Sequence, residues 1–399
     1  MNRNMRTMLA CVCLTLAAAG CSETPTEDNS IGGALTRSSF LIRDTTLYAT
    51  SGRSFQRTLA NNGAANLVGM AGGHTAYAVL QFPPSVMPIN DTDDVLSATL
   101  RIRFVSWFGD SAGPFGISVH RIVSASTWSP DSLVWQDVQS DFYDPTPLGA
   151  EQFFPVQGDT ETVSIMLDTT LIHSWFHAGN TGNPDSVDRG IILLPTSGTQ
   201  VVRGFNAFFF NTDSVQYYPT LQVAVHHPAI DSTETLTIQA GFDTHVAHLE
   251  NFTPNPDRLY TQAGIVYESR LTFDLGFIVR GTIISNAELV LINDPAETMI
   301  ATPATRIVTV HRSLSETDSA SFSFSSIDGI PTDGQPERYS FNVGALVQSL
   351  VRGPNYGITL RPSPATITSS LDRFAFYNAT VADSTLRPRL RILYTVEQE

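Results

Sequence analysis

The feature that most limits the possible folds is a pair of strand-like segments that occurs twice. The stretch at residues 95–123, "VLSATLRIRF…FGISVHRIV", returns downstream as "IISNAELVLI…TRIVTVHRSL". Ala98 corresponds to Ala287 and His120 to His311, so the offset between the copies stays nearly constant. A long, regular offset of this kind indicates a duplicated module. The chain is therefore predicted to use one fold twice.

The pattern within each copy predicts β-structure. Apolar residues at every second position from Ala98 to Phe104 alternate with Thr99, Arg101 and Arg103. This period of two is typical of a strand with one buried face and one face in water. Both copies contain further short apolar runs separated by Gly, Pro and Asn. The sequence thus predicts an all-β protein of two tandem antiparallel β-sandwich domains.

Matching motifs give the expected boundaries. "GIILLP" at Gly190–Pro195 corresponds to "GITLRP" at Gly357–Pro362, each near the end of its copy. We expect the first module to span residues 39–227 and the second to span 232–399. The stretch 228–231, which lies in the proline-containing and polar "HPAIDST", is expected to be the linker between them.

The chain begins with a predicted secretory signal peptide, residues 1–20. Arg3 and Arg6 precede an apolar run at 8–19 that is too short to span a bilayer. The small residues before Cys21 resemble a bacterial lipobox. In lipoproteins of that type the matching cysteine carries the lipid, so the resemblance implies lipidation of Cys21. The alternative is an ordinary cleaved signal with an incidental cysteine.

The segment that follows is expected to be a flexible tether, residues 21–38, because "SETPTEDNS" is polar and acidic. Ser22, directly after the cysteine, is the residue that enterobacterial sorting rules associate with the outer membrane. We therefore expect a lipid-anchored protein of the bacterial cell envelope, with the outer membrane as its location.

Composition excludes two classes of protein. The net charge of −15 and the pI near 4.9 argue against a nucleic-acid partner, because phosphate binding needs a basic surface. All three cysteines, Cys11, Cys13 and Cys21, lie near the start of the chain. The folded modules therefore contain neither a disulfide nor a thiolate metal site.

The first module contains a series of motifs that resembles a known family. In chain order they are "LQF…LSATLRIRF", "VHRI…STWSPDSLVW", a strand and short helix ending in Trp175, "GIILLP" and "FFFN…PTLQV". Their order resembles the secreted DNRLRE-type domain, which is similar to the jelly roll of carbohydrate-binding modules. The resemblance implies two jelly-roll-like sandwiches, an extracellular location and a non-catalytic role. In the second copy Leu350 replaces Trp175.

The candidate ligand-binding residues are aromatic. Trp107 and Phe108 follow the central strand in "FVSWFGDSAG", where flat faces held in water could stack on sugar rings. Arg101 and Arg103, on the wet face of the same strand, could donate hydrogen bonds to hydroxyls or acidic sugars. The alternative is a loop that folds back over the edge of the sandwich.

One acidic cluster suggests a metal. Asp91, Asp93 and Asp94 in "NDTDD" supply the oxygen ligands that Ca²⁺ prefers. The cluster lacks the glycine and distal glutamate of an EF-hand loop, so a solvated turn is the competing interpretation. Beyond this structural Ca²⁺ no cofactor is expected. His120 and His311, shared by both modules, are expected to be hydrogen-bonded structural histidines.

These observations favour a non-catalytic protein that binds glycan or matrix at the cell surface. No G-x-S-x-G motif or phosphate-cradling glycine loop is present. Two alternatives remain: a structural spacer or subunit of a surface assembly, and a polysaccharide-active enzyme whose carboxylates meet only in space. Polysaccharide or other surface proteins are the expected partners besides the membrane.

Overall fold

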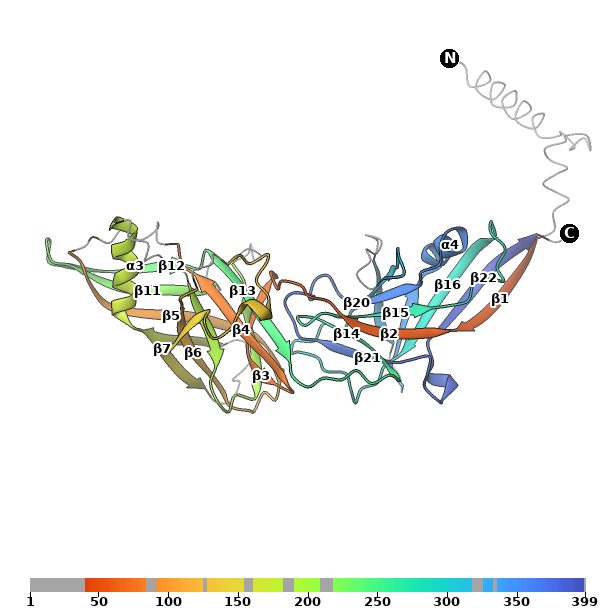
Figure 1. Cartoon of the computed structure of the whole chain (residues 1–399), viewed down its shortest axis with the longest axis horizontal. Helices are drawn as coiled ribbons and strands as arrows, with labels where there is room; N and C mark the ends of the chain where they lie inside the picture. Colours follow the sequence, from red (N-terminus) through yellow and green to blue (C-terminus); the bar gives the residue numbers. More distant parts are fainter. Residues whose placement is uncertain are drawn as a thin grey trace, which may run out of the picture.

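The structure is a computed structural model that describes residues 40–83, 90, 92–124, 128–153, 161–181, 190–208, 218–317, 326–332 and 336–397. The predicted signal peptide, Cys21 and the tether lie outside these residues. The described chain forms two elongated lobes joined end to end (Figure 1). Curled antiparallel sheets dominate both, and each carries one α-helix among its described residues. The predicted all-β, antiparallel β-sandwich class is confirmed.

The first lobe is a continuous piece of chain. Its elements are β3 (Ala65–Ala71), β4 (His74–Gln81), β5 (Asp94–Gly109), β6 (Phe115–Ile122), β7 (Tyr143–Phe153), β8 (Glu161–Leu167), α3 (Thr169–Thr181), β9 (Ile191–Pro195), β10 (Val201–Asn206), β11 (Thr220–His227), β12 (Ser232–Gln239) and β13 (Phe242–Leu249). The strands pair in the order β12-β11-β5-β10-β3-β4-β9-β6-β7, with β8 also on β5 and β13 also on β4.

The second lobe combines both ends of the described chain. Its elements are β1 (Phe40–Tyr48), β2 (Ser51–Gln56), β14 (Arg258–Gln262), β15 (Tyr267–Thr272), β16 (Ile283–Ile292), β17 (Val308–Arg312), β18 (Ile327–Thr332), β19 (Arg338–Asn342), α4 (Gly344–Arg352), β20 (Ile358–Pro362), β21 (Arg373–Tyr377) and β22 (Arg389–Glu397). The pairing order is β1-β22-β16-β19-β18-β17-β20-β15-β14-β21, with β2 also on β15.

The two lobes exchange their first two strands. β12 pairs with β11 in the first lobe, and β1 takes the matching place beside β22 in the second. Likewise β13 pairs with β4, whereas β2 pairs with β15. Each sequence repeat therefore begins with two strands that complete the lobe of the other repeat.

This exchange corrects the expected boundaries of 39–227 and 232–399. Residues 40–56 belong to the second lobe, and residues 232–249 belong to the first. The expected linker at 228–231 is the turn of the β11–β12 hairpin. The chain crosses between the lobes at 57–64 and again at 250–257. A repeat in sequence is thus not a unit in space, because strand patterns specify a buried face without specifying which sheet edge a strand joins.

Each lobe has its own apolar core. In β5 the side chains of Ala98, Leu100 and Ile102 are buried, and in β16 those of Ala287 and Leu289 are buried. The helices cover the ends of these cores. Trp175 on α3 and its replacement Leu350 on α4 are both buried.

A third apolar cluster joins the lobes. It contains Leu67, Phe108 and Val202 from the first lobe, and Ile265 and Leu371 from the second. Two chain crossings and a shared apolar cluster restrict motion between the lobes, because bending would expose buried surface.

Candidate functional site

Trp107 and Phe108 lie within β5 and do not form an exposed platform. A bulge between β5 and β10 shifts the register after Phe104. Beyond it Trp107 packs against the core of the first lobe, and Phe108, 3% exposed, faces the cluster between the lobes. The prediction of two aromatic faces held in water is therefore wrong for Phe108, and Trp107 is half-buried. The two side chains pack against different clusters, and Trp107 is only partly covered.

The backbone of Trp107 also connects the lobes. Its N–H donates to the carbonyl of Thr302 at 2.9 Å, and the N–H of Thr302 donates back at 2.8 Å. A second polar link joins the imidazole of His74 to the side-chain amide of Gln262, and their Nε2 atoms lie 2.7 Å apart. Burial lowers the pKa of His74 to about 4, so this histidine is neutral at pH 7. These contacts make the region an interface within the molecule.

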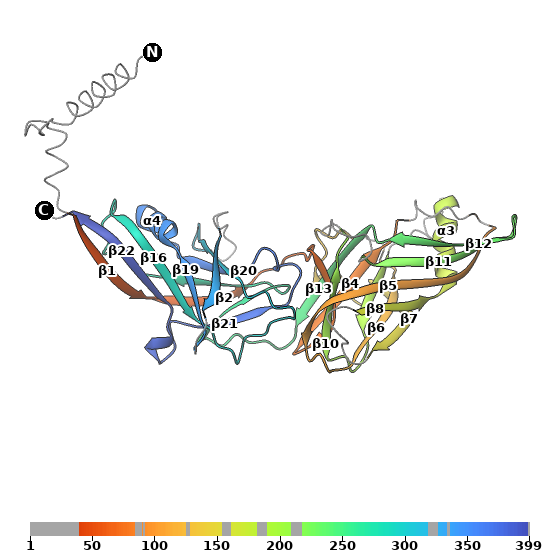
Figure 2. The ribbon, with the colours of Figure 1, turned by 180° about the vertical axis from the view of Figure 1, so that it is seen from behind.

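Arg101 and Arg103 line an open groove on the first lobe. The groove has a volume of about 360 Å³. Its lining comes largely from β8, β5, β11 and β12, which are neighbouring strands of the first lobe (Figure 2). We call it the arginine groove; its lining residues are Arg101, Ile102, Arg103, Thr162, Tyr218, Thr220, Gln222, Thr237 and Gln239. The alternation that buries Leu100 and Ile102 turns the two arginines outward, as the sequence predicts.

The arginine groove is rich in hydrogen-bonding groups. Three threonine hydroxyls and two glutamine amides surround the guanidinium groups of Arg101 and Arg103, and Tyr218 adds one aromatic ring. The glutamines and threonines escaped the sequence analysis because they lie on strands far apart in the chain. Gln222, on β11, faces Thr99 of β5 and Thr237 of β12 on either side. Polar residues at every second position of neighbouring strands face outward on the same side of the sheet, and this pattern would have identified these glutamines and threonines.

The second lobe carries a groove on the equivalent strands, with different chemistry. Val290 takes the place of Arg101 on the central strand, and the arginines come instead from β22 and from Arg338 of β19. Arg391 donates to Asp44 of β1, with Nε 3.1 Å from Oδ1. This hydrogen bond lowers the pKa of Asp44. Asp44 and Glu288 also line this groove, whereas no acidic side chain is among the lining residues of the arginine groove.

The acidic cluster does not form a metal centre among the described residues. Asp91 lies outside them. Both oxygens of Asp93 are engaged: Oδ1 is 2.9 Å from Nδ1 of His227, and Oδ2 accepts from the backbone N–H of Asn90 at 2.7 Å. Asp94 begins β5 and is exposed. No group of three or more His, Cys, Asp or Glu side chains suited to a metal occurs within the described ranges. Asp93 instead caps a turn and holds a histidine.

The two repeated histidines are hydrogen-bonded within their strands, as expected. His120 Nε2 lies 2.9 Å from the hydroxyl of Ser118, and its Nδ1 lies 2.9 Å from the carbonyl of Asp144. His311 Nε2 lies 3.2 Å from the hydroxyl of Thr309. A hydroxyl two residues before the histidine therefore recurs in both lobes. Both imidazoles are buried, which suits a structural role.

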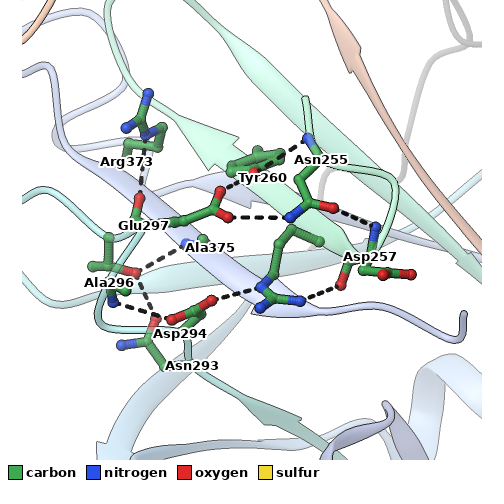
Figure 3. Close-up of polar contacts among 11 residues, drawn as sticks. Asn255, Asp257, Tyr260, Asn293, Asp294, Ala296, Glu297, Arg373 and Ala375 are labelled. Atoms are coloured by element: carbon green, nitrogen blue, oxygen red, sulfur yellow. Dashed lines mark hydrogen bonds and ion pairs between the residues drawn. The ribbon is translucent and has the colours of Figure 1, made fainter. Parts of the chain in front are cut away.

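A polar network missed by sequence reasoning secures the second crossing between the lobes (Figure 3). Tyr260 donates to Glu297, which also accepts from Asn255 Nδ2 at 3.2 Å. Arg258 donates to Asp294 at 2.6 Å. Asn255 and Asp294 belong to two proline turns, "NPD" and "NDP", that lie far apart in the chain. The carboxylates are thus bound to donors that hold turns in place, and we assign the network a structural role.

Comparison with known proteins adds no family. No family model matches the sequence, and no curated protein matches it. One similar solved structure is described as "BspA_C_WT", with 9% identity, 86% of this chain and 91% of that chain covered, and a TM-score of 0.14. Another is a structure of the Macrobrachium rosenbergii nodavirus, with 10% identity, coverage of 95% and 93%, and a TM-score of 0.12. At these TM-scores neither structure informs the function of this chain.

None of the helices in the described part of the chain is both long and apolar enough to cross a bilayer.

Proposed function

We propose that the protein is a non-catalytic lipoprotein of the bacterial cell envelope, a glycan-binding rod whose binding site is the arginine groove. The observation that carries the proposal is the outward pair Arg101 and Arg103 in an open groove of about 360 Å³. Guanidinium groups bind carboxylates through two parallel hydrogen bonds, so an acidic polysaccharide is the proposed ligand.

The shape of the groove supports a chain-like ligand. It is open and runs across four paired strands, which form a rigid support for its side chains. Arg101 and Arg103 are two positions apart on one strand, which places their Cα atoms roughly 7 Å apart. The amides of Gln222 and Gln239 offer both donors and acceptors to sugar hydroxyls, and Tyr218 offers one stacking face.

The proposed anchor is a lipid on Cys21, with the outer membrane as the proposed location. The described chain begins at Phe40, which lies opposite Glu397 at the outer end of the second lobe (Figure 1). An anchor upstream of Phe40 attaches the rod by that end. The arginine groove lies on the other lobe.

A structural spacer is the second candidate, and the construction of the rod favours it. Two chain crossings, the Trp107–Thr302 backbone pair and the apolar cluster resist bending between the lobes. A spacer needs this rigidity and needs no ligand. The enzyme alternative has no comparable support, because the carboxylates of the largest polar network, Asp294 and Glu297, are engaged with Arg258 and Tyr260.

Affinity electrophoresis of the full chain in gels containing acidic or neutral polysaccharides tests the proposal. We expect retardation by an acidic polysaccharide that Arg101→Gln with Arg103→Gln weakens at least about tenfold, because charged hydrogen bonds contribute roughly 1.5–3 kcal/mol each. The matched control is Arg389→Gln with Arg391→Gln in the second groove, which should leave the retardation unchanged. Equal migration of the wild type in every gel would favour the spacer.

A further inference from the structure

Five large apolar side chains are exposed at the outer end of the second lobe. Ile42 is 65% exposed, Val279 73% and Ile283 59%, and they are joined by Leu41 and Phe277. We call these five residues the apolar tip. Leu41 and Ile42 lie on β1, Ile283 begins β16, and the other two lie in the turn between β15 and β16.

The members of the apolar tip lie on both faces of the sheet around the end of β22. Thr395 pairs with Ile42 on one side and with Ile283 on the other, so the two isoleucines flank it on one face. On the strand's other face, the ring of Phe277 lies 6.3 Å from that of Tyr394. Five exposed large apolar side chains around the end of one strand are consistent with a contact site at this end of the molecule.

The duplication shows that the fold does not require apolar side chains at Val279 and Ile283. The matching segment of the first lobe also holds apolar residues, "FPPSVMPINDTD" between β4 and β5, but Asn90 and Asp94 stand where the second lobe has Val279 and Ile283. In the second lobe the turn reads "GFIVRGTI". Because both lobes share one strand order, the difference reflects a demand on this end of the molecule rather than a demand of folding.

We propose that the apolar tip rests on the lipid bilayer, with its side chains among the headgroups. The chain upstream supports this partner: residues 22–39 span at most about 60 Å between Cys21 and β1 even when fully extended. The exposed guanidinium groups of Arg43 and Arg280 lie beside the tip, and Asp274 is the acid on the same turn. Aliphatic and aromatic side chains with nearby arginines are the composition of interfacial membrane contacts.

This inference rests on the proposed lipid anchor and adds an orientation to it. A rod held by its lipid alone can lie in any direction, whereas a rod seated on its tip stands away from the surface. The hairpin turn between β11 and β12, at the opposite end of the rod, then lies farthest from the bilayer (Figure 1). Ile230 in that turn is 73% exposed, as is Val279 in the tip. The two positions therefore form a matched pair for labelling.

The test uses the lipidated full chain in vesicles of phosphatidylethanolamine and phosphatidylglycerol. Cleavage before Cys21 removes Cys11 and Cys13, and acylation occupies Cys21, so Val279→Cys or Ile230→Cys supplies the single free thiol. A nitrobenzoxadiazole label at 279 is expected to shift to the blue and to be quenched several-fold by nitroxide-labelled lipids. The same label at 230 should show neither effect. Equal spectra at the two positions would overturn the proposal.

An unlipidated arm separates the tip from the anchor and uses no glycan. In a Cys21→Ser protein, with Cys11 and Cys13 also replaced by serine, the label at 279 should still shift at high lipid concentration. Phe277→Ser with Ile283→Ser should abolish that shift. A shift at 279 that depends on protein concentration and occurs without lipid would mean that a second copy covers the tip, and the proposal would fail.

Discussion

Leu47, in the first strand of the structure, lies opposite Leu390, in the last. Both pack against the core of the second lobe. In the first lobe the matching place beside β11 is filled by β12, which follows β11 directly through a hairpin turn. The second lobe thus depends on strands that are synthesised before any part of the first lobe.

Truncation should expose this dependence. A chain that starts at residue 57 lacks β1 and β2. Of the strands that begin the two repeats it keeps only β12 and β13, although each lobe needs two such strands to complete its sheet. We expect one lobe to unfold, because a domain's net stability is only about 5–15 kcal/mol and the missing strands form two edges of its sheet. Residues 61–250, which hold a complete first lobe, should fold alone.

Amide NMR spectra and thermal melts distinguish these outcomes. The 61–250 fragment should show dispersed resonances and one cooperative transition, whereas the chain from residue 57 should lose one of the transitions of the full protein. Two intact transitions in the truncated chain would contradict the dependence on β1 and β2.

Two glycines in equivalent positions give a second prediction. Gly190 has φ +95°, and a Cβ there would lie 2.4 Å from the carbonyl oxygen of Leu80; Gly357 has φ +92°, with 2.3 Å to that of Leu271. Alanine at either site should cost about 3 kcal/mol or more in the free energy of unfolding, from strain and steric overlap together.

Gly198 is the matched control. Its φ is +87°, but a Cβ there would meet no atom within 4 Å. Gly198→Ala should therefore cost only about 1–2 kcal/mol, the price of the left-handed backbone alone. Urea unfolding measures all three variants, and equal losses would show that overlap with the carbonyls contributes nothing.

The alternation of apolar residues was enough to predict strands, an outward Arg101 and a duplicated fold. It was not enough to predict which lobe β1 joins, because either repeat offers a similar sheet edge to it. It also failed at Trp107 and Phe108, since the bulge after Phe104 reverses which residues face the core. The network around Glu297 joins turns far apart in sequence, and neither turn alone indicates its partner.

Ionisation of Asp243 should destabilise the protein at neutral pH. Burial raises the pKa of this carboxyl to about 6, although it accepts from the backbone N–H of Phe208 at 2.9 Å. A pKa above the unfolded value means that folding favours the protonated form, so this contribution is full at low pH and is lost as pH rises through about 6.

Asp243→Asn should therefore be more stable than the wild type at pH 8, by up to about 3 kcal/mol from a shift of roughly two pKa units. The asparagine oxygen can still accept from Phe208. Urea midpoints at pH 5 and pH 8 measure the difference, which should shrink at pH 5. A variant less stable at pH 8 would show that the charged carboxylate stabilises the fold.

Replacing His227 should remove stability near neutral pH, whereas replacing Asp243 should add it. Hydrogen bonds to Asp93 and Glu234 raise its pKa above 6.5. The stabilisation from its charged form is full below pH 6.5 and is lost as pH rises through the raised pKa. His227→Gln should flatten the melting temperature between pH 6 and pH 8, and NMR titration of the ring should give a pKa above 6.5. An unchanged pH profile would contradict the pairing.

The last prediction separates the interface between the lobes from the proposed binding groove. Trp107 packs against the first core while its backbone pairs with Thr302, and Phe108 is buried between the lobes. Trp107→Ala should lower stability by less than the roughly 3–5 kcal/mol usual for a fully buried large aromatic, because Trp107 is half-buried. Phe108→Ala should uncouple the two unfolding transitions, because the cluster that joins the lobes loses its largest side chain.

Neither change should weaken retention on an acidic polysaccharide at a temperature where the variant is folded, since the arginine groove lies on other residues of β5. Arg101→Gln should show the reverse pattern, with weaker retention and an unchanged melting temperature. Loss of retention in a folded Trp107→Ala protein would return the binding site to the aromatic pair and remove the case for the arginine groove.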